Sequence, residues 1–168
     1  MATSAGTTDM PTDQLHHTGL LVQDIEISAA FYIDVFEGHY LFKPAVTSGE
    51  SAQYVMGGHP GVAFKFCYIG FRTGAIELIQ FIGEPPEWAV GPRDGRLPHF
   101  ALAVDDVEAC VERIEASGGK RLWPEPVSWG GATVWYVTDP DGNPIELFDV
   151  PLDGIVSRTI EMFPESAP

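Results

Sequence analysis

The sequence predicts an α+β fold built from two copies of a strand–helix–strand–strand–strand (βαβββ) module. The stretch "HTGLLVQDIE", which begins at His17, aligns without a gap with "HFALAVDDVE", which begins at His99, and seven of the ten positions are identical or similar. A second pair of segments, "AIELIQF" around Glu77 and "PIELFDV" around Glu146, repeats later in the same order. Because similar segments in a constant order indicate a repeated structural unit, we expect a duplicated module.

The first module is predicted over residues 14–82. It opens with a strand at about residues 15–22, and the apolar spacing of "DIEISAAFYIDVFEG" then predicts an amphipathic helix that ends at Gly38. Three further strands are predicted near residues 39–46, 61–71 and 74–82. The stretch "TSGESAQYVMGGHPG" between the first two of these strands is predicted to be a long loop, because it is rich in Gly and Ser.

The second module is predicted over residues 98–150, with the same order of elements. A strand at about residues 98–104 leads into the helical pattern "DVEACVERIEASGG". Strands near residues 120–127, 132–138 and 143–150 complete it. Residues 83–97 have the Pro, Gly and charge content of a linker. The two ends, residues 1–13 and 151–168, are expected to be loose or docked on the surface.

Charge and hydropathy exclude several classes of protein. The chain has 24 acidic and 9 basic residues, and its net charge of −15 disfavours binding to nucleic acid or to anionic membranes. It contains neither an 18-residue apolar run nor a basic N-terminal region followed by an apolar stretch, so we expect a cytoplasmic protein. Cys67 and Cys110 lack metal or redox spacing and are expected to be buried, reduced thiols.

The repeat selects particular polar residues inside apolar segments. His17, and not its neighbour His16, matches the single His99 of the second copy. His16 is therefore expected to face outward, because adjacent residues of a strand point to opposite faces. Glu77 and Glu146 each place a carboxylate inside an apolar strand, where an unpaired charge is costly.

These features together resemble the vicinal oxygen chelate superfamily, which includes glyoxalases, bleomycin-resistance proteins and extradiol dioxygenases. The phrase "YVTDPDGNPIEL" is similar to the C-terminal signature of that family, and the resemblance covers about residues 14–150. It implies that two βαβββ modules pair to form a curved mixed sheet around a metal-binding cup. It also implies that the metal ligands come from the first and last strands of each module, at His17, Glu77, His99 and Glu146.

The chemistry of this residue set agrees with that implication. Two imidazoles and two carboxylates suit Zn, Ni, Co, Mn or Fe, and suit calcium or copper(I) poorly. In an octahedral field, four protein ligands leave two positions open. Two adjacent open positions are what a small substrate with neighbouring oxygens needs in order to chelate the ion.

Three functions are compatible with the resemblance. The first is a metal-dependent isomerase, epimerase or lyase that acts through a metal-bound enolate. In relatives of this type the residue that matches Glu146 is the base. Glu77 is expected to be a ligand that shares the proton transfer with Glu146 or exchanges roles with it. The second is an extradiol-type Fe(II) dioxygenase, in which the position of Glu77 is generally not a ligand. The third is a non-catalytic small-molecule binding or resistance protein.

Other features have simpler interpretations. A homodimer is expected because exposed sheet edges and apolar strand faces need cover. In this family the two modules can pair within one chain or between two chains, and we expect pairing within one chain slightly more than pairing across the dimer. Asp139, Asp141, Gly142 and Asn143 have the composition of a turn. Five residues are weaker site candidates that we expect to pack or to lie on the surface: His39, Tyr54, His59, Trp129 and Trp135. The basic residues Lys43, Arg72, Arg93 and Arg96 do not cluster in the sequence, which gives no support for an anionic coenzyme A substrate.

Overall fold

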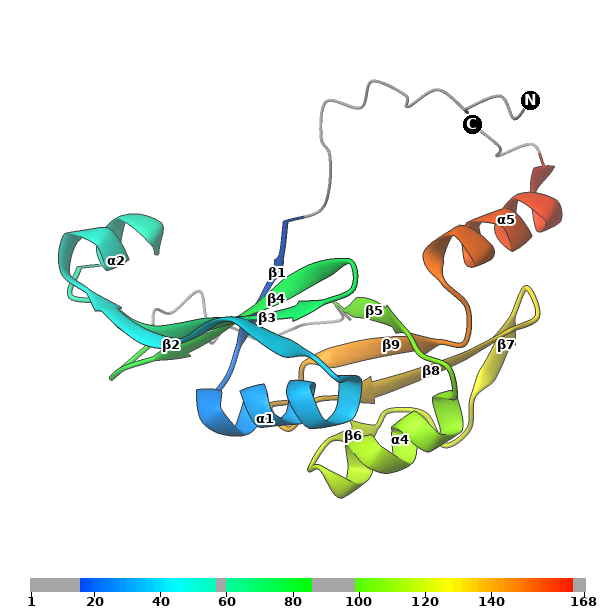
Figure 1. The fold of residues 1–168 in the computed structure, drawn as a ribbon, viewed down its shortest axis with the longest axis horizontal. Coiled ribbons are helices and arrows are strands. Elements are labelled where there is room, and N and C mark those ends of the chain that lie inside the picture. The colour runs from blue at the N-terminus through cyan, green and yellow to red at the C-terminus, as the bar shows by residue number, and fades with distance from the viewer. Residues whose placement is uncertain (1–15, 57–59, 86–98, 165–168) are drawn as a thin grey trace.

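The computed structural model describes residues 16–56, 60–85 and 99–164 and has the predicted α+β fold (Figure 1). The first half contains β1 (Thr18–Leu21), α1 (Ile25–Phe36), β2 (His39–Ser48), α2 (Gly49–Val55), β3 (Ala63–Phe71) and β4 (Gly74–Phe81). The second half contains β5 (Phe100–Ala103), α4 (Val107–Ala116), β6 (Lys120–Arg121), β7 (Val127–Trp129), β8 (Ala132–Thr138), β9 (Pro144–Phe148) and α5 (Leu152–Met162).

Each half forms its own mixed sheet. The strand orders are β1-β4-β3-β2 and β5-β9-β8-β6, with β7 paired to β8. In both sheets the first strand runs parallel to the last strand, and the other pairings are antiparallel. The register is also equivalent, because Gly19 faces Glu77 and Ala101 faces Glu146. This pairing brings the start of each module beside its last strand, although the two are far apart in sequence.

The two helices that follow β1 and β5 lie side by side on one side of the sheets (Figure 1). Asp24 caps α1 by accepting hydrogen bonds from the backbone N–H groups of Glu26 and Ile27, and Asp106 caps α4 in the same way through Ala109. The buried faces of both helices contribute to one hydrophobic core, which also contains apolar residues of both sheets. The two modules are therefore packed together through a shared core.

A turn in the second module adds polar contacts to this packing. The carboxylate of Asp139, which is 1% exposed, accepts hydrogen bonds from the Tyr32 hydroxyl at 2.8 Å and from the backbone N–H of Asn143 at 2.7 Å. The Asn143 side chain donates to the carbonyl of Leu21 at 3.1 Å. Asp141 accepts from the Ser28 hydroxyl. The predicted turn residues thus also hold the second module against β1 and α1 of the first.

Helix α1 ends differently from the prediction. Glu37, and not Gly38, adopts the left-handed conformation, with φ of 57°. A Cβ atom on Gly38 would lie 2.6 Å from the Cγ2 of Ile69 and 3.0 Å from the carbonyl of Tyr32. The glycine is therefore required by the close approach of β3, and the turn itself is made by a residue that bears a side chain.

Three segments contain elements that the sequence pattern did not predict. Helix α2 lies within the predicted loop that follows β2. The strand predicted near residues 120–127 is divided into β6 and β7, because Pro124 and Pro126 cannot donate ladder hydrogen bonds. The C-terminal segment contains α5, which lies on the opposite side of the second sheet from α4 (Figure 1).

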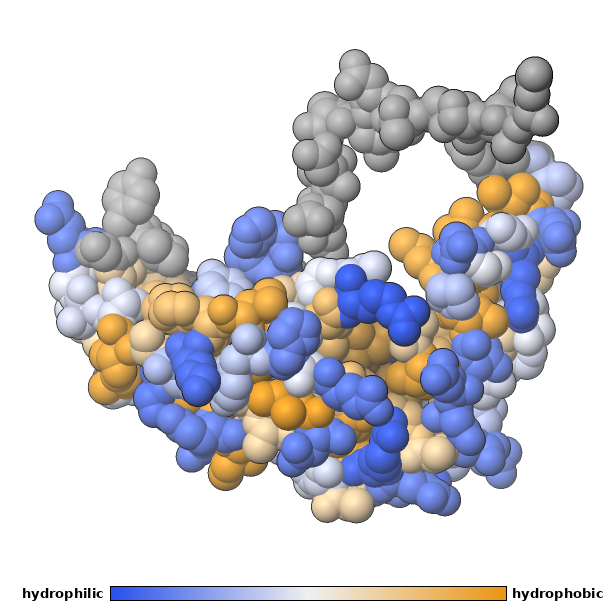
Figure 2. Space-filling model, in the orientation of Figure 1, coloured by the Kyte–Doolittle hydropathy of each residue, from blue (hydrophilic) through white to orange (hydrophobic). Residues whose placement is uncertain are grey.

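Helix α5 exposes much of its apolar surface. None of its residues is buried, and Leu152 is 76% exposed. Figure 2 shows apolar side chains of this helix interspersed with polar ones. Its contact with the second sheet includes a hydrogen bond from the Arg158 guanidinium to the carbonyl of Gly130 at 3.2 Å.

Two further expectations concern the thiols and the membrane. Cys67 and Cys110 are both free and buried, as predicted. Among the helices of the described residues, none is long and apolar enough to cross a membrane.

Candidate metal and active site

The first half-site consists of His17, Glu77 and Tyr68. The Nε2 atom of His17 lies 3.2 Å from the Oε2 atom of Glu77. The hydroxyl of Tyr68 donates a hydrogen bond to the other carboxylate oxygen, Oε1, at 2.9 Å. Tyr68 and Glu77 are direct cross-strand partners on β3 and β4, so their side chains project from the same face of the sheet.

The second half-site repeats this arrangement with His99, Glu146 and Tyr136. The Nε2 atom of His99 lies 3.3 Å from the Oε2 atom of Glu146. Tyr136 and Glu146 are direct cross-strand partners on β8 and β9. The hydroxyl of Tyr136 lies 3.1 Å from Nε2 of His99. Glu146 is close enough to contribute to the raised pKa of Tyr136.

Both half-sites are partly open to solvent. The histidine side chains are 30% and 34% exposed, and both glutamate side chains are 17% exposed. Burial, and then the hydrogen bond to Glu77, raises the pKa of Tyr68 to about 12. Burial, and then the interaction with Glu146, likewise raises the pKa of Tyr136 to about 12. Both phenols are therefore neutral near pH 7 and can donate a proton to a hydrogen bond.

The two tyrosines are the site residues that sequence reasoning missed. Tyr68 precedes Glu77 by nine residues in "CYIGFRTGAIEL", and Tyr136 precedes Glu146 by ten residues in "WYVTDPDGNPIEL". A tyrosine in an apolar strand usually indicates packing, so neither residue was distinctive by itself. The signal was their recurrence at nearly the same distance before the two repeated glutamates.

His16 is exposed, as predicted, but the prediction that it faces away from His17 is wrong, because both side chains line one cavity and both residues precede the first residue of β1. The Nδ1 atom of His16 lies 2.6 Å from Nδ1 of His17, and the two rings meet edge to face with centroids 4.8 Å apart. His16 therefore contacts the ring nitrogen of His17 that faces away from Glu77. No equivalent histidine precedes His99, because residue 98 is proline.

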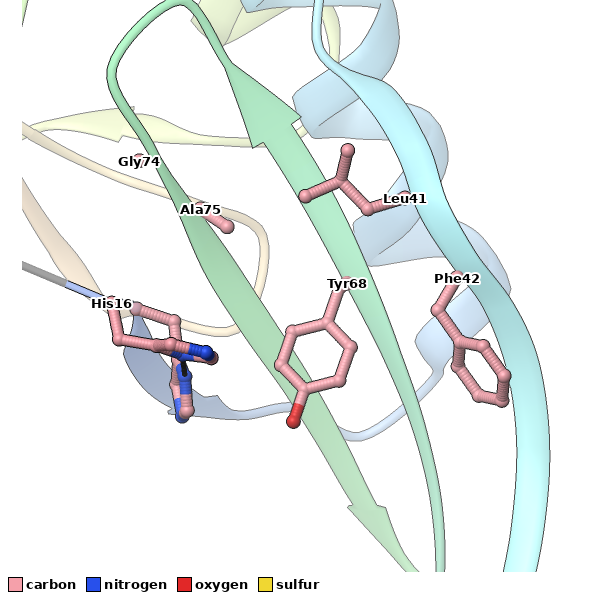
Figure 3. Close-up of a pocket in the computed structure, with 7 residues that line it drawn as sticks. His16, Leu41, Phe42, Tyr68, Gly74 and Ala75 are labelled. Atoms are coloured by element: carbon pink, nitrogen blue, oxygen red, sulfur yellow. Dashed lines mark hydrogen bonds between the residues drawn. The ribbon is translucent and has the colours of Figure 1, made fainter.

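A cavity of about 400 Å³ opens beside the first half-site. It is lined by His16, His17, Leu41, Phe42, Tyr68, Gly74 and Ala75. Figure 3 shows the ring of Tyr68 between His16 and the two apolar side chains of β2. Leu41 and Phe42 are 60% and 45% exposed. The histidines thus border a space with one apolar wall.

The structure brings the four predicted ligands together as two pairs. No group of three or more His, Cys, Asp or Glu side chains suited to one metal ion occurs among residues 16–56, 60–85 and 99–164. All four predicted ligands belong to these ranges. A single chain therefore presents two separate His–Glu pairs.

The weaker candidates lie elsewhere or outside the described residues. Trp135 is 6% exposed and donates its indole N–H to the carbonyl of Trp123, which fits a packing role. Trp129 is half exposed on β7. His39 lines a second cavity of about 270 Å³ together with Arg72. His59, Arg93, Arg96 and the side chain of Tyr54 are outside the described part of the chain, as is most of the predicted linker, residues 86–97.

Known proteins share this sequence pattern and fold. The sequence model of the Glyoxalase/Bleomycin resistance protein/Dioxygenase superfamily matches residues 14–147. The lactoylglutathione lyase of Haemophilus influenzae is 30% identical over 139 residues, which cover 81% of this chain and 92% of that protein. An uncharacterized protein of Bacillus subtilis is 32% identical over 139 residues, which cover 80% of this chain and 96% of that protein.

Solved structures agree on the fold. A glyoxalase family protein from Bacillus cereus superposes with a TM-score of 0.68 at 16% identity, covering 85% of this chain and 97% of that chain. Glyoxalase I of Leishmania major superposes with a TM-score of 0.62 at 18% identity, covering 92% of this chain and all of that chain. The chain belongs to the glyoxalase, bleomycin resistance protein and dioxygenase superfamily.

Proposed function

We propose that this protein is a metal-dependent lyase of glyoxalase type, or a closely related isomerase or epimerase. Its substrate is a small molecule with vicinal oxygens, such as an oxygenated carbonyl compound or a thioester. The main observation in favour is the pair of equivalent contacts between a histidine Nε2 and a glutamate Oε2, at 3.2 Å and 3.3 Å. Relatives named lactoylglutathione lyase support the lyase class.

The residues present fit a divalent metal. In each half-site an imidazole nitrogen and a carboxylate oxygen face each other at a partly exposed surface, so two such pairs supply a mixed nitrogen and oxygen set. His17, Glu77, His99 and Glu146 would hold Zn, Ni, Co, Mn or Fe. A metal held there would supply Lewis-acid stabilisation of the negative charge that develops on a substrate with vicinal oxygens.

The complete site is proposed to form in a homodimer. Because one chain presents the two His–Glu pairs separately, four ligands meet only when the first half-site of one copy faces the second half-site of another. The exposed apolar side chains beside the first half-site, Leu41 and Phe42, supply surface for such contact. In a twofold dimer this arrangement generates two identical sites.

Glu146 is proposed as the residue that moves the proton. A carboxylate that coordinates a metal is a weak base, so a glutamate that serves as both ligand and base would have to leave the ion before it could take the proton. The Tyr68 hydroxyl donates a hydrogen bond to Glu77, whereas the Tyr136 hydroxyl lies 3.1 Å from the Nε2 atom of His99. Glu77 is thus fixed by a tyrosine hydrogen bond, whereas the tyrosine of the second half-site is directed at the histidine. This difference favours Glu146 as the mobile carboxylate and Glu77 as the persistent ligand.

The equivalence of the two half-sites also bears on the extradiol-type dioxygenase. Such an enzyme uses two histidines and one carboxylate to hold iron. Here Glu77 faces His17 in the same way that Glu146 faces His99, which favours four ligands over three.

The proposal is tested by metal analysis of protein purified without an affinity metal, followed by activity measurement after adding Ni, Zn, Co, Mn or Fe(II) in turn. The first assay follows lactoylglutathione, the compound in the names of the relatives, by its thioester absorbance. Stoichiometric metal binding with activity that chelation removes is expected. Absence of bound metal under all five conditions would refute the proposal, and recovery with iron alone accompanied by oxygen uptake would favour the dioxygenase.

A further inference from the structure

The two tyrosines occupy equivalent places at the two half-sites. Tyr68 and Tyr136 each lie on the strand next to the glutamate strand, directly opposite the glutamate in the antiparallel ladder. Each ring also meets the histidine of its half-site edge to face, with centroids 5.4 Å apart for His17 and 5.0 Å apart for His99. Each tyrosine therefore contacts both predicted ligands of its own sheet.

The two carboxylate oxygens of Glu77 have different partners. Oε2 faces the Nε2 atom of His17, and Oε1 accepts the hydrogen bond from Tyr68. A carboxylate held in this way offers one oxygen to a metal while the other is fixed by a phenol. The side chain is then restricted to one orientation before any ion binds, which lowers the entropic cost of coordination.

The second half-site has the same parts with one difference. The Tyr136 hydroxyl lies 3.1 Å from Nε2 of His99, the nitrogen that faces Glu146. Glu146 itself lies directly opposite Tyr136 in the ladder between β8 and β9. When Nε2 is used as a ligand, its lone pair is no longer available to the phenol. The hydroxyl of Tyr136 is then free to donate to Glu146, its cross-strand partner, as Tyr68 donates to Glu77.

We infer that Tyr68 and Tyr136 are paired positioning residues, and that each phenol orients the glutamate ligand on its own sheet for metal binding. The inference rests on the proposed function, since it assumes that both glutamates are ligands. At Glu77 the phenol keeps the carboxylate in place. At Glu146 the phenol would keep the carboxylate oriented if the side chain left the metal.

The test measures metal affinity in Tyr68→Phe and Tyr136→Phe, with Tyr40→Phe on β2 as the matched control. Cobalt(II) dissociation constants come from competition with a chromophoric chelator, and the visible cobalt spectrum reports ligand geometry. Each site variant is expected to bind about 10- to 100-fold more weakly, the usual cost of losing a group that orients a metal ligand. The cobalt dissociation constant of Tyr40→Phe is expected to stay within about twofold of the parental value, because Tyr40 belongs to neither half-site.

A second comparison separates orientation from a general structural role. In a Glu77→Ala background, Tyr68→Phe is expected to change cobalt affinity less than about twofold, because the residue that Tyr68 orients is gone. In a Glu146→Ala background, Tyr68→Phe retains its full effect. The thermal unfolding midpoint of the metal-free protein is expected to stay near that of the parent in both tyrosine variants.

The outcomes are distinguishable. If the parent binds cobalt and both tyrosine variants bind it equally well with unchanged spectra, the inference is wrong and the proposed function stands. An effect of Tyr68→Phe that persists undiminished in the Glu77→Ala background also overturns it. If the parent binds no cobalt, the proposed function and the inference are both refuted.

Discussion

The first and second half-sites contain the same three residue types, His, Glu and Tyr, but differ in the residues around them. The first half-site has His16 against the ring of His17 and an apolar cavity wall made by Leu41 and Phe42. It lies on a sheet whose last three strands contain 10, 9 and 8 residues. The second half-site lies on a sheet with shorter strands, and Tyr136 there contacts both the histidine and the glutamate.

This difference indicates that the repeated and the non-repeated parts of the two modules have different roles. The parallel pairing of the first and last strands repeats the His–Glu contact in both modules. The walls around that contact come from β2 and from the segment before β1, which differ between the modules. The repeated part is therefore suited to holding a common ligand, and the unequal part to recognising a substrate that is itself asymmetric.

The largest expected effect comes from removing either histidine. His17→Ala and His99→Ala should each abolish stoichiometric metal binding while far-ultraviolet circular dichroism stays near that of the parent. Activity should fall by more than the approximately 10²–10⁴-fold that loss of a general base costs, because charge stabilisation is lost as well. Metal content and activity are measured on each purified variant.

Mixing these two variants tests whether the half-sites meet between chains. In a mixed dimer, one site combines both substitutions and the other combines two intact half-sites. After equal amounts are refolded together, about half of the dimers are mixed, so metal content should recover to about a quarter of the parental value. If the mixture binds no more metal than the separate variants, the two pairs meet within one chain and the dimer proposal is wrong.

The next effect distinguishes the two glutamates. Glu146→Gln should lower hydrogen–deuterium exchange at the acidic carbon of the substrate by about 10²–10⁴-fold, because an amide can still coordinate through oxygen but is not a useful base. Bound metal is measured on the same samples and should remain. Glu77→Gln is the matched control. Loss of exchange in Glu77→Gln alone would reverse the two roles, and unchanged exchange in both variants would remove the glutamates from proton transfer.

These predictions depend on features that the sequence revealed to different degrees. The histidines and glutamates could be predicted because they recur at matching places in two aligned segments. The role of Tyr68 could not, because its contact with Glu77 depends on the register between β3 and β4. The separation of the two His–Glu pairs in one chain also depends on how α1 packs against α4, which no local pattern specifies.

Local exceptions explain two of the differences between the predicted and the observed fold. Gly38 has the residue type of a helix C-terminus, but the turn is made by Glu37 and the glycine is needed for contact with Ile69. Pro124 and Pro126 divide a segment whose apolar content otherwise suits one strand. At Gly38 a Cβ atom would clash with Ile69, and at Pro124 and Pro126 the missing backbone N–H prevents continuous strand pairing.

A moderate effect is expected at the turn that joins the modules. Asp139→Ala leaves the Tyr32 hydroxyl and the backbone N–H of Asn143 without their buried acceptor, so it should lower the free energy of unfolding by about 3 kcal/mol or more. Denaturant unfolding measures this value. Asp141→Ala is the control and should cost about 1 kcal/mol, because Asp141 is only partly buried. Equal losses in both variants would show that the buried network contributes little to packing of the modules.

The smallest expected effect concerns His16, which has no counterpart in the second half-site. Its ring contacts Nδ1 of His17 and leaves Nε2 directed at Glu77. A group that hydrogen-bonds to a ligand histidine usually fixes the ring orientation, and its loss costs about 10–100-fold in metal affinity. His16 is exposed, however, so water can replace it. His16→Ala should therefore weaken cobalt binding by less than about 10-fold, measured by chelator competition beside His17→Ala. Equal metal loss in the two variants would mean that His16 is itself a ligand and that the alignment of His17 with His99 does not identify the metal-binding histidine.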